Sequence, residues 1–199
     1  MKKSKRSKAW SNTKLITHYI FAIGLLAFFF PTYPASALFL GFLVSFVMDN
    51  LGHERKGYGT RRTWVTHSIF TASALGIVLG ILLVFGFQYA KLPFSFVVFA
   101  LQGFVSALSH LFLDSITEGG IFILTKRFAL AHFRYDNPFL NTGFALLGIF
   151  LLALSIFPQI KLFWRHYYPW YLVAHLILAC VLHAFCLLNF FCIKKHARA

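Results

Sequence analysis

The sequence has 199 residues, of which 59% are hydrophobic, 19% aromatic and only 12% charged. This composition, with a mean hydropathy of +0.72, excludes a water-soluble globular domain. The net charge is +14, but the basic residues are scattered over separate segments and form no single stripe, so we predict no binding to nucleic acid. The chain is predicted to be an integral membrane protein whose partners are membrane lipids, and the sequence implies no protein partner.

Long uncharged runs define the predicted elements in chain order, since a helix needs about 20 residues to cross a membrane. The runs cover residues 15–48, 63–90, 92–113, 137–160 and 166–193. The first is long enough for two short helices with a turn at Pro31 and Pro34. We therefore predict an all-α fold: a polytopic membrane helix bundle of about six transmembrane helices. A single transmembrane domain would span residues 15–193, between basic tails at residues 1–14 and 194–199.

The N-terminal segment also permits a second interpretation. Residues 1–14 are basic, residues 15–30 are apolar, and Ala35-Ser36-Ala37 resembles a signal-peptidase site. Cleavage there would leave five transmembrane helices. His18 interrupts the apolar stretch and the small residues can equally begin a second helix, so we favour the uncleaved, six-helix arrangement.

The 19 Lys and Arg residues predict the orientation, because short loops rich in them stay in the cytoplasm. With six helices, 16 of them fall on the side of the two termini and 3 on the other side. Both termini are therefore expected to be cytoplasmic. On that same face, residues 121–134 mix aromatic and basic side chains and predict an interfacial helix. Asp136, which follows it, is expected to form a local ion pair with Arg134.

Acidic residues are rare in this chain, and three of the five lie four positions from a histidine. Asp49 precedes His53 by four residues and Asp114 follows His110 by four, a spacing that places two side chains on one face of a helix. A carboxylate beside an imidazole is expensive to bury in an apolar chain unless a cation lies between them. This pattern points to a metal site.

The six-helix arrangement brings further polar residues to the same cytoplasmic level. Four helix ends would contribute, and the predicted metal ligands are His18, Asp49, His53, His67, His110 and Asp114. Three or four imidazoles with two carboxylates could surround one or two divalent ions. Zinc is expected first, with manganese or iron as alternatives, because a mixed His/Asp set without thiolate does not discriminate sharply among them. The competing interpretation is a set of separate interfacial histidines, each hydrogen-bonded to a neighbouring helix.

Four stretches carry a resemblance to a known family: residues 17–21 (THYIF), 49–54 (DNLGHE), 62–68 (RTWVTHS) and 109–120 (SHLFLDSITEGG). They resemble the signatures of the YdjM-type membrane-bound metal-dependent hydrolases, and an archaeal and archaeal-virus branch of that group whose function is unassigned. The resemblance implies a multi-helix membrane enzyme with His and Asp ligands and a phospholipase-like activity. Two departures are the absence of the Pro-Asp-x-Asp-His form in the second motif and Arg61-Arg62 in place of a His-Arg pair.

The remaining site predictions concern catalysis. Glu54 and Glu118 are possible general bases, although each also fits a solvated loop acid. Arg62, within the His67 motif, is the predicted contact to a substrate phosphate, although the basic residues of this loop can equally serve only to fix the topology. We expect a hydrolase acting on a lipid phosphoester or related membrane substrate at the cytoplasmic face. The alternatives are a non-catalytic membrane protein with a structural metal and, because the ligands lie at helix ends, less readily a cation transporter.

Overall fold

The computed structural model describes residues 7–56, 59–123, 125–157, 159 and 162. The chain divides into two compact units, Met1–Phe157 and Pro158–Ala199. All the helices and strands described below belong to the first unit. The predicted crossing at residues 166–193 and the C-terminal tail lie outside the described residues.

The first unit is built mainly of helices, as predicted. They are α1 (Ser7–Phe29), α2 (Pro34–Gly52), α3 (Trp64–His67), α4 (Ile69–Tyr89), α5 (Phe96–Ile116) and α6 (Pro138–Ile156). Four of them, α2, α4, α5 and α6, are long and apolar enough to cross a membrane, and α1 adds a shorter apolar stretch, Leu15–Phe29. These helices coincide with the first four uncharged runs of the sequence. α1 begins at Ser7, inside the segment predicted to be a tail.

Local sequence explains where several of these helices begin. Proline occupies the first turn of α2 and of α6, where its missing N–H costs no hydrogen bond. At the start of α6, Asn137 Oδ1 accepts from the backbone N–H groups of Phe139 and Leu140 at 3.0 and 3.2 Å. At the start of α5, the Ser95 hydroxyl accepts from the Val98 N–H. These caps satisfy N–H groups that the helices cannot satisfy internally.

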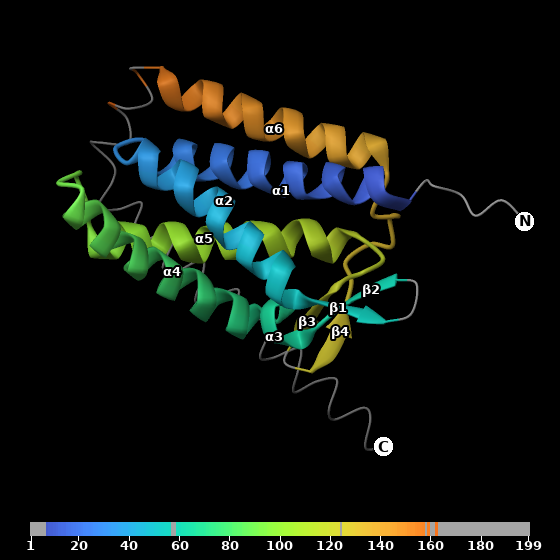
Figure 1. The fold of residues 1–199 in the computed structure, drawn as a ribbon. Coiled ribbons are helices and arrows are strands. Elements are labelled where there is room, and N and C mark those ends of the chain that lie inside the picture. The colour runs from blue at the N-terminus through green and yellow to red at the C-terminus, as the bar shows by residue number, and fades with distance from the viewer. Residues whose placement is uncertain (1–6, 57–58, 124, 158, 160–161, 163–199) are drawn as a thin grey trace, which may run out of the picture. The chain divides into compact units, whose positions relative to one another are not determined.

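The helices pack in pairs, α1 with α6 and α4 with α5, and α2 contacts both α1 and α5 (Figure 1). Glycines allow the close approaches. A Cβ on Gly24 would lie 2.0 Å from the Gly148 carbonyl oxygen, and one on Gly76 would lie 2.2 Å from the Gly103 carbonyl oxygen. Small residues at such crossings let helix backbones touch, which favours helix association in a membrane.

Buried hydrogen bonds fix α2 against α5. The Ser36 hydroxyl donates to Gln102 Oε1 at 2.6 Å, and the Ser106 hydroxyl donates to the Leu40 carbonyl at 3.1 Å. Ser36, Gln102 and Ser106 are completely buried, so no water competes for these bonds. Because the bonds set the register of the two helices, they bring Asp49 at the end of α2 close to α5.

Two small hairpins lie at one end of the bundle (Figure 1). Strands β1 (His53–Lys56) and β2 (Gly59–Arg62) pair antiparallel with His53 opposite Arg62. Strands β3 (Ile121–Ile123) and β4 (Lys126–Phe128) pair antiparallel with Ile121 opposite Phe128. The first hairpin replaces the loop expected between the second and third transmembrane helices.

The second hairpin shows that the predicted interfacial helix at residues 121–134 is wrong. Gly120 turns the chain with a φ of +60°, a conformation that favours glycine, and the chain then continues as β3. Further on, the Leu130 N–H donates to the Ser115 carbonyl at 2.7 Å, and the Phe133 N–H donates to the Ile116 carbonyl at 3.3 Å. A helix would keep these N–H groups for its own bonds, whereas here they attach the segment to the end of α5.

Candidate metal centre

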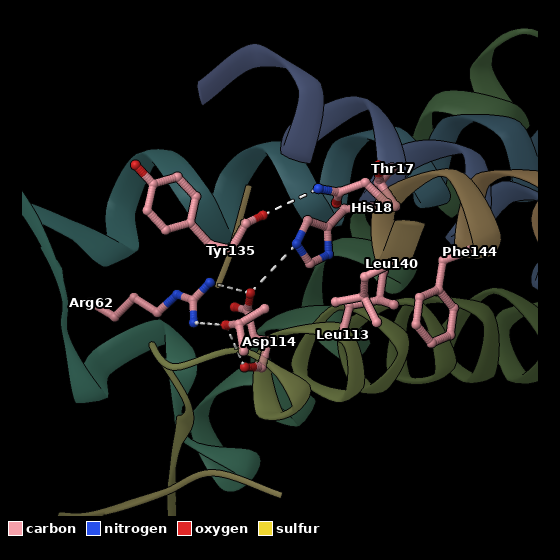
Figure 2. A pocket seen from close by; sticks show the side chains of 10 residues that line it. Thr17, His18, Arg62, Leu113, Asp114, Tyr135, Leu140 and Phe144 are labelled. Atoms are coloured by element: carbon pink, nitrogen blue, oxygen red, sulfur yellow. Dashed lines mark hydrogen bonds and ion pairs between the residues drawn. The ribbon is translucent and has the colours of Figure 1, made fainter. Parts of the chain in front are cut away.

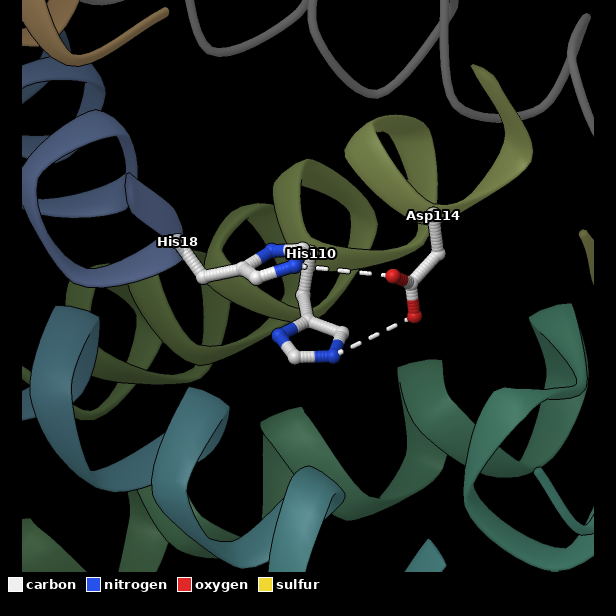
Figure 3. A group of neighbouring side chains, drawn as sticks. All are labelled: His18, His110 and Asp114. Atoms are coloured by element: carbon white, nitrogen blue, oxygen red, sulfur yellow. Dashed lines mark ion pairs between the residues drawn. The ribbon is translucent and has the colours of Figure 1, made fainter. Parts of the chain in front are cut away.

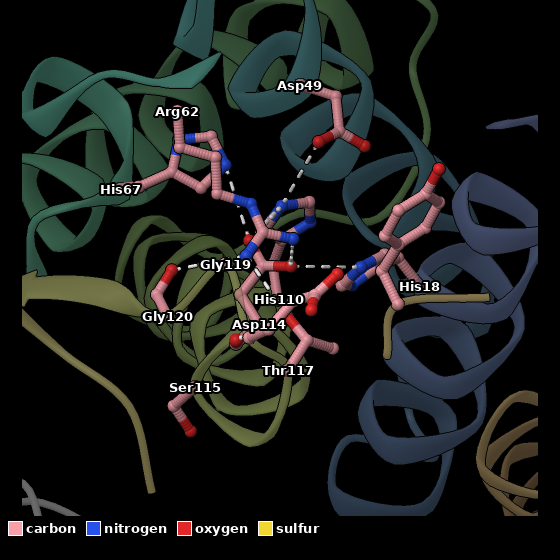
Figure 4. A network of polar contacts seen from close by, with 12 residues as sticks. His18, Asp49, Arg62, His67, His110, Asp114, Ser115, Thr117, Gly119 and Gly120 are labelled. Atoms are coloured by element: carbon pink, nitrogen blue, oxygen red, sulfur yellow. Dashed lines mark hydrogen bonds and ion pairs between the residues drawn. The ribbon is translucent and has the colours of Figure 1, made fainter. Parts of the chain in front are cut away.

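Five of the six predicted metal ligands meet at the end of the bundle that carries the hairpins (Figure 4). They come from four elements: His18 from α1, Asp49 from α2, His67 from α3, and His110 and Asp114 from α5. Four of these side chains are almost completely buried, and Asp49 is about one-fifth exposed. The convergence expected from the sequence is therefore present in the fold.

Asp114 is the centre of this cluster. One carboxylate oxygen, Oδ2, lies 3.3 Å from His67 Nε2 and 3.4 Å from His110 Nε2. The other oxygen, Oδ1, lies 3.5 Å from His18 Nε2 and accepts a charge-assisted hydrogen bond from Arg62 Nη2. Asp114 thus connects two environments, one formed by His67 and His110 and one by His18 and Arg62 (Figures 3 and 4).

Among the residues that the structure describes, two groups of three side chains have ligand atoms that all lie within 4.8 Å of one another. One contains His18, His110 and Asp114, and the other contains Asp49, His67 and His110. His110 belongs to both, and its Nε2 lies 3.5 Å from Asp49 Oδ1. The His18 ring stacks on the His110 ring with centroids 4.1 Å apart (Figure 3). Three protein ligands is the number that catalytic zinc sites use.

The hydrogen bonds of Thr66 determine which nitrogen of His67 carries the proton. The Thr66 hydroxyl donates its hydrogen to the Met48 carbonyl at 3.1 Å, so its oxygen accepts from His67 Nδ1, 3.0 Å away. Burial lowers the pKa of His67, which favours the neutral ring. Nε2 then has no hydrogen and presents its lone pair to the Asp114 carboxylate. Histidine ligands in metal sites are oriented in this way by a bond at the other nitrogen.

The residues of the cluster fit a divalent metal ion. In the described part of the chain, five of their buried polar atoms have no hydrogen-bond partner: His18 Nδ1, His67 Nε2, His110 Nδ1, His110 Nε2 and Asp114 Oδ2. A lone pair facing a carboxylate in a buried site is costly unless a cation lies between them. Ligand atoms about 2.0–2.1 Å from a tetrahedral zinc ion lie about 3.3–3.4 Å apart. The separations from Asp114 Oδ2 to the nitrogens of His67 and His110, 3.3 and 3.4 Å, match this spacing.

Arg62 contributes to the site differently from what the sequence suggested. Besides Asp114, its guanidinium donates to Thr117 Oγ1 and to the Gly120 carbonyl, both at 3.2 Å. The expected role was a contact to substrate phosphate. The structure shows that Arg62 holds the carboxylate of Asp114 in place, and its contact to substrate phosphate stays a prediction.

The other predicted residues lie around the cluster. His53 begins β1, where its Nδ1 lies 2.7 Å from the Asp49 carbonyl oxygen, and its ring contacts the His67 ring with centroids 5.1 Å apart. His53 belongs to neither group of three. Glu54 follows it in β1 with its backbone opposite Arg61, and its side chain lies outside the described part of the structure.

The carboxylate of Glu118 is not part of the cluster. Glu118 is exposed and belongs to neither group of three, so its placement gives no support to the predicted role as general base. The predicted local ion pair is confirmed, since Arg134 Nη2 lies 3.1 Å from Asp136 Oδ2. His132 and Asp136, which also lie four positions apart in the sequence, belong to neither group of three.

A small pocket, open to solvent, lies beside the cluster (Figure 2). Ten residues line it: Thr17, His18, Arg62, Leu113, Asp114, Thr117, Tyr135, Leu140, Asn141 and Phe144. Polar side chains of the cluster thus share one pocket with apolar side chains from α5 and α6. A polar group bound here would lie against Asp114 and His18.

Comparison with known proteins gives a family. Residues 13–113, just over half of the chain, match the family described as "Protein of unknown function (DUF1286)". The chain belongs to this family. The part that matches DUF1286 contains all the histidines of the cluster together with Asp49, and it ends one residue before Asp114. No curated protein matches the chain, and no solved structure does.

Sequence reasoning missed two parts of the site of this DUF1286 protein. Thr66 directly precedes His67 in the third motif, so its position offered a signal that we did not use. Leu140, Asn141 and Phe144 lie in an uncharged run that indicates only a membrane span, and nothing in that run indicates a pocket.

Proposed function

We propose that the protein is a membrane-embedded, metal-dependent hydrolase that acts on a lipid phosphoester or related membrane substrate at the cytoplasmic face. One observation supports this most: Asp114 has one oxygen within 3.4 Å of Nε2 of both His67 and His110, and it also lines a pocket with an apolar wall. A structural metal site needs the first feature only, whereas a lipid hydrolase needs both.

Either the group of His18, His110 and Asp114 or the group of Asp49, His67 and His110 would hold the divalent ion, which we expect to be zinc. When bound, such an ion lowers the pKa of a water molecule toward neutrality and polarises a phosphoryl oxygen. Thr66 orients the His67 ring through Nδ1, and Arg62 keeps Asp114 aligned through its guanidinium. Both contacts reduce the rearrangement needed when substrate arrives, because the ligands are already positioned.

The location of the site suits a lipid headgroup. The cluster lies at the ends of apolar helices long enough to cross a membrane, where a phosphate can reach it without entering the hydrocarbon. Hydrolysis would replace the ester O–P bond by a bond from phosphorus to the oxygen of water, and the departing alcohol would take up a proton. His18 and Thr17 from α1 and Leu140 from α6 form walls that restrict bulk water on two sides of Asp114.

A second candidate function is a structural metal site without turnover. It is favoured by the depth of the group formed by Asp49, His67 and His110, because the residues lining the pocket include none of these three. An ion held only there would tie together α2, α3 and α5. The two functions differ in whether the metal-loaded protein consumes lipid.

The test uses the full-length protein, purified with zinc and reconstituted in vesicles of mixed phospholipids. Released headgroup, phosphate and fatty acid are measured for the wild type, for Asp114→Asn and for the matched control Asp136→Asn. We expect Asp114→Asn to lower release by about 100-fold or more, since a lost ligand removes the water-activating ion, and Asp136→Asn to behave as wild type. If metal-loaded wild type releases none of these products from any lipid class, the structural-metal function is the correct one.

A further inference from the structure

The loop of residues 118–120, which follows α5, lies between two arginines. On one side, Arg62 Nη1 donates to the Gly120 carbonyl at 3.2 Å (Figure 4). On the other side, Arg127 of β4 donates from Nε to the Gly119 carbonyl at 2.7 Å and from Nη2 to the Glu118 carbonyl. Three successive carbonyl groups of loop 118–120 are therefore each held by a guanidinium group.

The glycines of this loop lie in direct contact with their neighbours. A Cβ on Gly119 would lie 2.2 Å from Arg62 Nη1, so there is no space between the backbone of the loop and this guanidinium. A Cβ on Gly120 would lie 2.5 Å from the Phe128 carbonyl oxygen, so the backbone of β4 contacts the loop as well. Any shift of loop 118–120 must therefore also move the guanidinium of Arg62.

The same guanidinium reaches the metal centre. Arg62 donates to the carboxylate of Asp114, which is 1% exposed, and to Thr117 Oγ1. The other carboxylate oxygen of Asp114 lies 3.3 Å from His67 Nε2 and 3.4 Å from His110 Nε2. A continuous series of contacts thus leads from β4 through loop 118–120 and Arg62 to the cluster.

The geometry of the Arg127 contact makes it more than an ordinary surface bond. An exposed hydrogen bond contributes little by itself, because water competes for both groups. Arg127, however, donates to two consecutive carbonyls from one planar, rigid guanidinium, which fixes the orientation of the loop as well as its distance. The pairing of β3 with β4 places Arg127 opposite Phe122 and so holds its backbone in register.

We infer that Arg127 is a positioning residue of the metal centre. It fixes loop 118–120, the loop fixes the guanidinium of Arg62, and Arg62 aligns Asp114. The inference rests on the metal centre of the proposed function and is independent of hydrolysis. It also gives Glu118 a role through its backbone carbonyl in place of its carboxylate.

The sign of the expected effect separates positioning from charge. Removal of a positive charge by itself favours a nearby cation, so a purely electrostatic role of Arg127 would make Arg127→Met bind zinc more tightly. We expect Arg127→Met instead to weaken zinc binding by about tenfold, as for other contacts that orient metal ligands. Lys126→Met is the matched control, since it removes the same charge from an exposed neighbour on β4 and should not weaken binding. Arg127→Lys keeps the charge but lacks the fork of donors, so it should also weaken binding.

Zinc affinity is measured by chelator competition with the full-length protein, alone and in a variant without the link to Asp114. In an Arg62→Met background, adding Arg127→Met should change the affinity by less than about twofold, because the series of contacts is already broken. A general loss of stability would instead lower the affinity by the same factor in both backgrounds. If Arg62→Met does not fold, Arg62→Lys keeps a charge beside Asp114 and replaces it.

A second measurement does not depend on metal. In the zinc-free protein, backbone amide exchange of residues 116–121 should be faster in Arg127→Met than in Lys126→Met, because the loop is then held on one side only. Exchange of residues 138–145, at the start of α6, should be the same in both variants.

Two results of the zinc measurement would overturn the inference: equal zinc affinity of Arg127→Met and Lys126→Met, or the same loss from Arg127→Met with and without Arg62. The proposed function fails separately. If the wild type binds no zinc, the metal centre is removed and exchange decides: faster exchange of residues 116–121 in Arg127→Met supports the positioning role, and equal exchange overturns it. The expected zinc affinities without hydrolysis of any lipid support the inference and remove the hydrolase.

Discussion

A single methyl group at Gly119 should disturb the metal centre through Arg62. The φ of Gly119 lies outside the left-handed region, so its backbone tolerates alanine. A Cβ there would, however, lie 2.2 Å from Arg62 Nη1 and 2.8 Å from Arg62 Cζ. A typical contact between carbon atoms is about 3.5 Å. The guanidinium must therefore move by about 1 Å to make room for the methyl group. Gly119→Ala should therefore break the contacts that align Asp114.

The size of the effect follows from the bonds that are lost. Asp114 is 1% exposed, so water cannot replace the hydrogen bond that Arg62 donates to it. A hydrogen bond to a charged group contributes about 1.5–3 kcal/mol. Loss of a contact that orients a metal ligand typically weakens metal binding by about 10–100-fold. This change in affinity corresponds to about the same free energy as the lost hydrogen bond. We expect a decrease of that size in zinc affinity for Gly119→Ala.

The assay is competition between the purified protein and a chromophoric zinc chelator, for Gly119→Ala and for Gly143→Ala. Gly143 lies within α6, and a Cβ there meets nothing within 4 Å. Alanine also favours a helix over glycine by about 0.8–1.0 kcal/mol, so this control should keep its zinc affinity and unfold no more readily. Metal-free Gly119→Ala should unfold more readily than wild type. Wild-type zinc affinity together with wild-type stability in Gly119→Ala would refute the role assigned to Arg62.

The remaining predictions concern the ligands and the topology. Removal of the ligand by His67→Ala should eliminate most of the bound metal, as measured by elemental analysis, and full retention would contradict its assignment. Thr66→Val removes only the acceptor for His67 Nδ1, so it should weaken zinc binding by about 10–100-fold in the chelator assay without abolishing it. A cysteine introduced at Leu130, near the cluster, should label from the cytoplasmic side. One introduced at Tyr89, at the end of α4 away from the cluster, should label from the outer side. Labelling of both from one side would reject the proposed orientation.

Much of the cluster could be predicted because its residues are unusual for their surroundings. Carboxylates are rare in this chain, and the pairs Asp49 with His53 and His110 with Asp114 stand out against uncharged runs. The alternation of helices across a membrane then places helix ends at one level. Those two considerations together were sufficient to bring His18 and His67 to the same region without any contact information.

The rest depended on contacts that no local pattern specifies. Arg62 reaches Asp114 across 52 positions of sequence, and its contact to the Gly120 carbonyl requires the turn at Gly120. Residues 121–134 have a composition that suits an interfacial helix, but tertiary hydrogen bonds to the end of α5 stabilise a hairpin and an irregular segment instead. Phe144 belongs to an uncharged run, so only the packing of α6 shows that it lines a pocket.

X-ray absorption spectroscopy of the purified, full-length protein tests the metal centre most directly. The account predicts a stoichiometric divalent metal, zinc first, with nitrogen and oxygen ligands at about 2.0–2.1 Å, imidazole scattering and no sulfur ligand. His110→Ala should remove the signal, because His110 belongs to both groups of ligands, and the exposed His132→Ala should retain it. Protein that binds no metal when zinc is supplied, or a spectrum dominated by sulfur at about 2.3 Å, would contradict the account.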